Sequence, residues 1–312
     1  SITKENAYKH LSILASDEYE GRETGQKGGW MAADYIQTQF KNFGLKAPVK
    51  GKYFQAIDLS NFELTQSIVT INGEAKEYLK DFIINPSSVK GEGFTFNNKA
   101  VVFVGYGSLT DLKGLDLKDK VVMMMPDKTP ADRPTMRKRM QEQQEKVAFL
   151  ADQQAAALLI IDSSLDNMSE EAKERIRHNQ SQMVLKTASK MAAMNTKKSV
   201  PTITISTEAA NSILKSGNST VDALQKQLKE TGKTAPVTID AAFCASAVRK
   251  ETPLKADNVL GFLEGSDPVL KNEVLVITAH YDHIGLEATG TDKVNNGADD
   301  DGSGTVSLLE LA

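Results

Sequence analysis

Two short motifs between residues 279 and 304 contain side chains that could bind a metal ion. The first, 279–283, reads AHYDH, and the second, 297–304, reads GADDDGSG. Zinc sites take imidazole nitrogen and carboxylate oxygen as ligands. The two motifs therefore make His280 and Asp300 candidate metal ligands, with a nitrogen from one motif and a carboxylate from the other.

The spacing within the motifs gives each acidic residue a distinct use. Asp282 lies two residues after His280, on the same side of an extended segment, so its carboxylate can approach the imidazole. A carboxylate hydrogen-bonded to a ligating histidine fixes the ring's tautomer and strengthens its donation. Asp300 carries two carboxylate oxygens and could bridge two metal ions, which a single ring nitrogen cannot do.

A structural explanation of the same residues stays open on spacing alone. A histidine after a strand commonly has a structural role, and three adjacent aspartates can form a solvated turn. The acidic run also lacks the alternating pattern of a calcium-binding loop of the EF-hand kind.

The segment before the first motif predicts the element that would position it. Residues 273–278 (EVLVIT) are apolar and β-branched, which is typical of a buried strand in a largely parallel sheet. Catalytic and binding groups gather beyond the carboxyl ends of such strands, which is where His280 would lie. Residues 257–265 predict the preceding strand, and a short loop at 266–268 would join the two as a hairpin.

The N-terminal region predicts two helices around a loop. Apolar residues recur at helical spacing over 2–15 and again over 30–43, with Trp30 expected in the helix core. Gly44 follows where a glycine commonly ends a helix. Residues 16–25 are polar and contain glycines, which indicates a loop.

The middle of the chain reads as a separate α/β module inserted into a first domain. Residues 53–71 predict short strands broken by turns at Asn61 and Asn72-Gly73. Further strands are predicted at 101–107, 120–126, 157–162 and 201–206, with helices at 146–157 and 207–214. We therefore expect one domain at 1–92 and 239–312, and an inserted domain at 93–238.

Composition excludes several classes of protein. The 312 residues are 40% hydrophobic and 25% charged, with a formal net charge of -4 and no basic stripe of the kind that binds nucleic acid. A single cysteine excludes an internal disulfide framework, and no apolar run is long enough to span a membrane. The chain begins at Ser1 rather than Met, which suggests a processed or trimmed start.

Four segments resemble a known family. Residues 278–285 (TAHYDHIG) and 296–304 (NGADDDGSG) are similar to the metal-binding motifs of the co-catalytic di-zinc aminopeptidases, peptidase family M28. Residues 15–25 (ASDEYEGRETG) resemble the opening loop of that family, and 93–238 resembles its inserted protease-associated domain. The resemblance implies an α/β fold: a mixed sheet with helices on both faces, incomplete at the C-terminus, plus the smaller inserted α/β domain.

The resemblance also implies roles for individual residues. His280 would bind one zinc ion, Asp300 would bridge two zinc ions, and Asp282 would orient His280. Asp301 would follow the bridging residue at a peptide of unusual geometry, and His283 would not be a direct ligand. The implied activity is the release of N-terminal residues from peptide substrates.

The glutamate general base and the remaining zinc ligands of the family would follow Ala312. The chain is therefore expected to be the N-terminal portion of a longer enzyme, with metal weakly bound or absent and no activity of its own. A non-catalytic binding protein on the same scaffold, a glutaminyl cyclase and a carboxypeptidase or dipeptidase remain alternatives. The resemblance to this family also implies that the protein is exported, either to the periplasm or as a secreted protein. The sequence does not indicate an oligomeric state.

Overall fold

The computed structural model describes residues 2–126, 133–178, 182–185, 199–232, 236–287 and 290–312. The chain forms two compact units. The first, here called the helical unit, contains Ser1–Ser60, Leu185–Thr187 and Pro253–Ala312, and the second, here called the sheet unit, contains Asn61–Val184 and Ala188–Thr252. Strands and helices together confirm the predicted α/β class.

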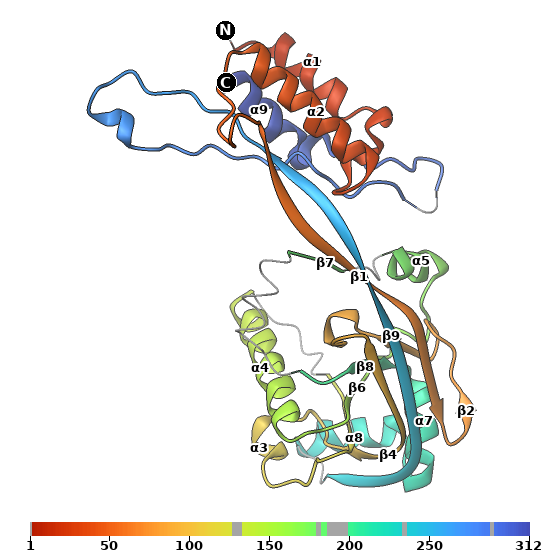
Figure 1. The fold of residues 1–312 in the computed structure, drawn as a ribbon. Helices are drawn as coiled ribbons and strands as arrows, with labels where there is room; N and C mark the ends of the chain where they lie inside the picture. The colour runs from red at the N-terminus through yellow and green to blue at the C-terminus, as the bar shows by residue number, and fades with distance from the viewer. Residues whose placement is uncertain (1, 127–132, 179–181, 186–198, 233–235, 288–289) are drawn as a thin grey trace. The chain divides into compact units, whose positions relative to one another are not determined.

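Three helices form the core of the helical unit. They are α1 (Lys4–Leu14), α2 (Lys27–Asn42) and α9 (Ser303–Leu311), which lie side by side in Figure 1. Their buried apolar side chains pack into one cluster, namely Leu14, Ala32, Ile36, Phe40, Leu45, Val306 and Leu309. The two predicted N-terminal helices are confirmed, and α9 joins them to the C-terminal motif.

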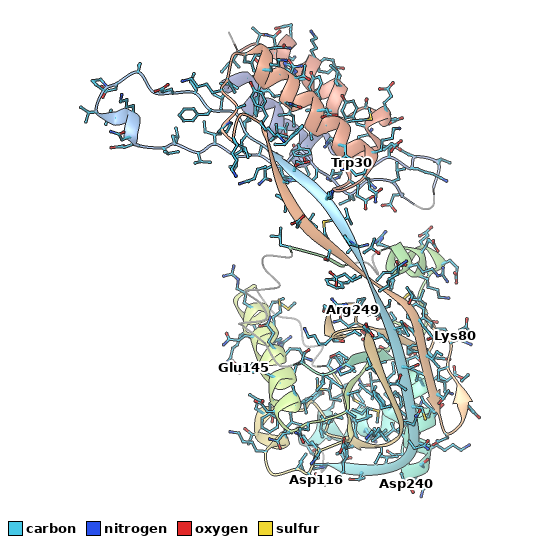
Figure 2. The ribbon with its side chains drawn as sticks, in the orientation of Figure 1. Trp30, Lys80, Asp116, Glu145, Asp240 and Arg249 are labelled. Carbon is cyan, nitrogen blue, oxygen red and sulfur yellow. The ribbon has the colours of Figure 1, made fainter. Side chains whose placement is uncertain are left out.

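Trp30 does not occupy the helix core as predicted. Its side chain is 52% exposed on the surface of α2 (Figure 2). The buried stripe of α2 instead consists of small residues and two larger ones: Gly28, Gly29, Ala32, Ala33, Ile36 and Phe40. Trp30 lies two positions from Gly28 and from Ala32, so the helical period turns it away from that stripe.

The predicted hairpin before the first motif is wrong. The strand β9 (Val237–Val259) ends at Val259, and residues 273–278 form no strand. Leu275 is 86% exposed and its neighbours Val274 and Val276 are 78% and 71% exposed. A strand needs a hydrogen-bonded neighbour, and no strand among the described residues pairs with this run. The motif at His280 is therefore held by other contacts.

The described strands form one mixed sheet. Neighbouring strands follow the order β2-β1-β9-β4-β5-β6-β8-β3, and β7 pairs with β1. Strands β4, β5, β6 and β8 are parallel neighbours, whereas β3 and β9 pair antiparallel at the two sides of this group. The remaining strands are β1 (Phe54–Ile71), β2 (Glu74–Ala75), β3 (Phe82–Ile84), β4 (Gly93–Phe103), β5 (Val121–Met124), β6 (Ala157–Ile161), β7 (Gln182–Leu185) and β8 (Thr202–Ile205).

Helices cover both faces of the sheet within the sheet unit. Alternate residues of a strand point to opposite faces, and Val101 and Val102 accordingly belong to two different hydrophobic clusters. Leu112 and Leu150 pack on the Val102 side, and Leu224 packs on the Val101 side. The helices of this unit are α3 (Leu109–Leu112), α4 (Arg133–Asp152), α5 (Glu170–His178), α7 (Thr207–Leu214) and α8 (Val221–Thr231).

Most of the elements predicted for the middle of the chain are present. The four strands correspond to β4, β5, β6 and β8, and the two helices correspond to α4 and α7. Residues 54–71 form one long strand rather than several. The turn at Asn72-Gly73 is confirmed, because both residues have positive φ (51° and 82°) and connect β1 to β2 as a tight hairpin.

The predicted inserted domain, 93–238, falls in the sheet unit except for Leu185–Thr187, and the sheet unit also contains 61–92 and 239–252. Its assignment as a protease-associated domain stays a prediction. No helix among the described residues is long and apolar enough to cross a membrane.

Replacing Leu14 by alanine is expected to destabilise the helical unit. Leu14 is 1% exposed in the three-helix core, and truncating a buried leucine costs about 2–5 kcal/mol because a cavity remains. Tyr8→Ala on the same helix is the matched control, since Tyr8 is 68% exposed and should change stability by less than about 0.5 kcal/mol. Urea unfolding of the three proteins measures the difference, and equal losses would contradict the predicted core.

Candidate metal centre

The two sequence motifs are joined through the backbone of His280. Its amide donates to Oδ2 of Asp301 at 3.2 Å, and its carbonyl accepts a hydrogen bond from the hydroxyl of Thr305 at 2.9 Å. Asp301 and Thr305 belong to the second motif and to α9. The histidine is thus fixed by the second motif rather than by a neighbouring strand.

The imidazole of His280 lies between two carboxylates. Its Nδ1 is 3.0 Å from the carbonyl oxygen of Asp282 and 3.4 Å from Oδ1 of the same residue. Its Nε2 is 3.1 Å from Oδ1 of Asp300. The structure therefore brings together His280, Asp282 and Asp300, the three residues predicted for the site.

This arrangement suits a cation between His280 and Asp300. When Nδ1 donates its proton to the Asp282 carbonyl, Nε2 and the Asp300 oxygen both present lone pairs, so a proton or a cation must join them. Two ligands on one tetrahedral zinc ion, at bond lengths of about 2.0–2.1 Å, are roughly 3.3–3.4 Å apart. The observed 3.1 Å is close to that separation. The two side chains fit as part of a zinc coordination sphere.

The acidic surroundings favour a positive charge on the ring. Burial lowers the pKa of His280, but the hydrogen bond to Asp282 and the negative charges of Asp282, Asp301 and Asp300 outweigh it, so the pKa lies above its usual value. The same negative charges would attract a metal cation.

The three aspartates of the second motif have different surroundings. Asp301 is committed at both oxygens, since Oδ1 accepts from the amide of Gly304 and Oδ2 from the amide of His280. The Asp300 side chain is 74% exposed and faces Nε2 of His280. The peptide bond between Asp300 and Asp301 is cis, so the unusual geometry expected there is present. Of Asp300 and Asp301, Asp300 is therefore the one available to a ligand, and of the aspartates in this motif it is the one whose carboxylate faces the His280 ring.

A buried arginine ties the motifs to the N-terminal region. Arg22 is 1% exposed and donates four hydrogen bonds to backbone carbonyls. Their acceptors are Tyr281 at 2.7 Å, Leu14 at 2.6 Å, Asn296 at 2.6 Å and Gly297 at 2.8 Å. Burial lowers the pKa of Arg22, and the nearby charge of Asp282 opposes that effect. One side chain thus joins α1, the first motif and the second.

Further hydrogen bonds continue this connection along the loop at 15–25. The side-chain amide of Asn296 donates to the carbonyl of Ala15 and to Asp17, each at 2.8 Å. The amides of His283 and Gly285 donate to carbonyls of the same loop, those of Arg22 and Gly21. The loop that resembles the family's opening segment is therefore a frame around both motifs.

His283 contributes mainly through its backbone. Its amide is bonded to the loop, and its ring lies against Gly297. A Cβ at position 297 would lie 2.6 Å from that ring and 2.6 Å from the Asp300 carbonyl, and φ is +55°. Only glycine fits this position without displacing the neighbouring atoms.

Sequence reasoning missed the residues that support the site. The positions of Arg22, Thr24, Asn296 and Thr305 carry no spacing signal, because each acts through a contact with a residue distant in sequence. The available signal was the resemblance of residues 15–25 to a family loop, which marks the segment without assigning roles. Thr24 donates a hydrogen bond to Oδ2 of Asp282.

The described residues provide part of a metal centre. No group of three or more His, Cys, Asp or Glu side chains that could hold a metal ion is present among them. His280 and Asp300 supply one nitrogen and one carboxylate, and Asp282 supports the histidine. The roles of the three residues as ligands and orienting group stay predictions.

Comparison with known proteins addresses the C-terminal part of the chain. Residues 258–312, which contain both motifs, match the model of Peptidase family M28. The predicted resemblance is thus confirmed where the metal-binding motifs lie. No curated protein matches the chain.

Three solved structures are similar to the chain at low identity. An aminopeptidase from Aneurinibacillus sp. strain AM-1 has a TM-score of 0.49 and 18% sequence identity. The match covers 98% of this chain and 57% of the aminopeptidase chain. A zinc aminopeptidase from Bacillus subtilis has a TM-score of 0.42 at 16% identity, covering 98% and 56%. A family M28 peptidase precursor from Shewanella amazonensis has 0.42 at 15%, covering 97% and 58%. The chain spans a little over half the length of each.

Replacing Arg22 by methionine is expected to destabilise the protein strongly. The change removes four hydrogen bonds and leaves buried carbonyls without partners, which should cost about 3 kcal/mol or more. Lys27→Met is the matched control, because Lys27 makes an exposed ion pair with Glu20 and its loss should cost less than about 1 kcal/mol. Urea unfolding would contradict the role of Arg22 if the two variants lost similar stability.

Replacing Tyr281 by phenylalanine is expected to change how stability depends on alkaline pH. Burial raises the pKa of Tyr281 to about 12 from 10.0, and its hydroxyl donates to the Asp257 carbonyl at 2.6 Å. The raised pKa contributes stability that is fully present below pH 10 and is lost as pH rises toward 12. Wild type should therefore lose stability relative to Tyr281→Phe across that window in urea unfolding. If the difference in unfolding free energy between the two proteins stayed constant from pH 10 to pH 12, the raised pKa of Tyr281 would be refuted.

Proposed function

We propose that this chain belongs to a zinc-dependent aminopeptidase that hydrolyses N-terminal residues from peptides. The observation that supports this best is the convergence of His280 Nε2 and Asp300 Oδ1, 3.1 Å apart, inside the segment that matches peptidase family M28. Both atoms are of the type that zinc prefers. The side chains that carry them are accessible to a ligand, since His280 is 54% exposed and Asp300 is 74% exposed.

The side chains around this pair have separable tasks in the proposed reaction. His280 and Asp300 would hold the metal, and Asp282 would keep the His280 ring in the tautomer that leaves Nε2 free. Asp301 would fix the backbone of His280. Bound zinc supplies a Lewis acid that lowers the pKa of a water molecule and polarises a peptide carbonyl.

Peptide hydrolysis also requires a group that accepts the proton from water. Among the described residues, Asp301 accepts backbone hydrogen bonds at both carboxylate oxygens, and Asp282 accepts one from Thr24. The resemblance to peptidase family M28 implies a glutamate outside these two motifs as the general base, and the proposed activity is that of the whole protein that carries them.

Zinc binding by the chain is expected to depend on His280 and not on His283. Removing a ligating imidazole should weaken zinc affinity at least about tenfold, because even the loss of a supporting residue costs that much. His283→Ala is the matched control, since His283 contacts the loop mainly through its backbone. Isothermal titration calorimetry with zinc chloride would contradict the assignment if both variants bound zinc like the parent.

Hydrolysis of aminoacyl-nitroanilides tests the proposed activity. The whole protein that carries these motifs should release nitroaniline with zinc present, stop after chelation, and lose activity on Asp300→Ala, whereas the 312-residue chain by itself should not release it. Zinc binding without hydrolysis of any aminoacyl substrate would instead favour a non-catalytic binding protein. Release of C-terminal residues from peptides with a blocked N-terminus would indicate a carboxypeptidase instead. Cyclisation of N-terminal glutamine would indicate a glutaminyl cyclase.

A further inference from the structure

Thr24 contacts the residue that orients the candidate metal ligand. Its hydroxyl donates a hydrogen bond to Oδ2 of Asp282, and the other oxygen of that carboxylate, Oδ1, lies 3.4 Å from Nδ1 of His280. Three side chains therefore stand in series, from the hydroxyl through the carboxylate to the imidazole. The Nε2 atom at the far end of the ring faces Asp300.

The backbone fixes where the Thr24 hydroxyl lies. The adjacent residue Glu23 forms a β-bridge with His283, and the amide of His283 donates to the carbonyl of Arg22 at 3.2 Å. Arg22 is itself buried and bonded to the carbonyl of Tyr281. Residues 22–24 thus run beside 281–283, and this pairing sets Thr24 opposite Asp282.

Without the hydroxyl, the Asp282 carboxylate would be less constrained. The Asp282 side chain is 44% exposed, so it could turn toward water. A terminal carboxylate torsion is broad and has no strong intrinsic preference. The hydrogen bond from Thr24 occupies Oδ2 and leaves Oδ1 at 3.4 Å from Nδ1 of His280, beside the 3.0 Å contact that Nδ1 makes with the backbone carbonyl of Asp282. The hydroxyl can therefore affect the ring without touching it.

We propose that Thr24 is a positioning residue for metal binding: its hydroxyl holds Asp282 in the orientation that aligns His280 with the metal. This inference rests on the proposed function, since it assumes that His280 is a zinc ligand. Outer partners of a ligating histidine tune metal affinity by roughly 10–100-fold. Thr24 contacts Asp282 rather than His280 itself, so we expect loss of its hydroxyl to weaken zinc affinity by about tenfold, the lower end of that range.

The test compares Thr24→Val with Thr24→Ser in the full chain. Valine keeps the shape of threonine and removes the hydroxyl, whereas serine keeps the hydroxyl and removes the methyl group. Titration with zinc chloride should show about tenfold weaker binding for Thr24→Val and binding within about threefold of the parent for Thr24→Ser. Thr38→Val is the matched control, because that hydroxyl bonds only within α2, to the carbonyl of Asp34.

Metal-free urea unfolding of the same variants separates positioning from folding. A purely structural role would lower the unfolding midpoint of Thr24→Val and leave its zinc affinity unchanged, and that result would overturn the inference. Equal losses of affinity in Thr24→Val and Thr24→Ser would also overturn it, because the hydroxyl would not be responsible. Failure of the parent itself to bind zinc would contradict the proposed metal centre, and with it this inference, whereas failure confined to the variants leaves the metal centre intact.

Discussion

The guanidinium of Arg22 is the contact on which the geometry of the motifs depends. It is buried, and it uses four of its five N–H donors on backbone carbonyls of three segments far apart in sequence. Backbone carbonyls in a loop need such partners when water is excluded. Because the acceptors include Tyr281 and Gly297, one planar group is hydrogen-bonded to both motifs at once.

This arrangement has costs that the surrounding residues offset. A buried charge is unfavourable without compensation, and Arg22 also has a positive φ of 51°, which is uncommon for a side chain of this size. The four carbonyl dipoles and the nearby charge of Asp282 provide that compensation. The same carboxylate that would orient His280 therefore also stabilises the arginine, so the frame and the candidate ligand share one negative charge.

The sequence predicted the parts of the structure that depend on local pattern. Helical spacing located α1 and α2, short apolar runs located strands of the sheet unit, and the pair Asn72-Gly73 located a hairpin turn. The run at 273–278 has the composition of a buried strand and yet is exposed, because composition cannot supply a neighbouring strand. His280, Asp282 and Asp300 were recognisable from residue type and family resemblance. Arg22 and Thr24 were not, because their importance arises from contacts across more than 250 residues.

Asp301 connects the candidate site to the local stability of a helix. One of its oxygens accepts from the amide of Gly304 in the first turn of α9, and the other accepts from the amide of His280. The first turn of α9 therefore cannot fray without loosening His280, and Thr305, which holds the histidine carbonyl, lies in that same turn. Local opening of this nine-residue helix would therefore also release the backbone contacts that hold His280. Val306 and Leu309 pack the same helix into the three-helix core, so that core supports the position of a side chain that is itself exposed.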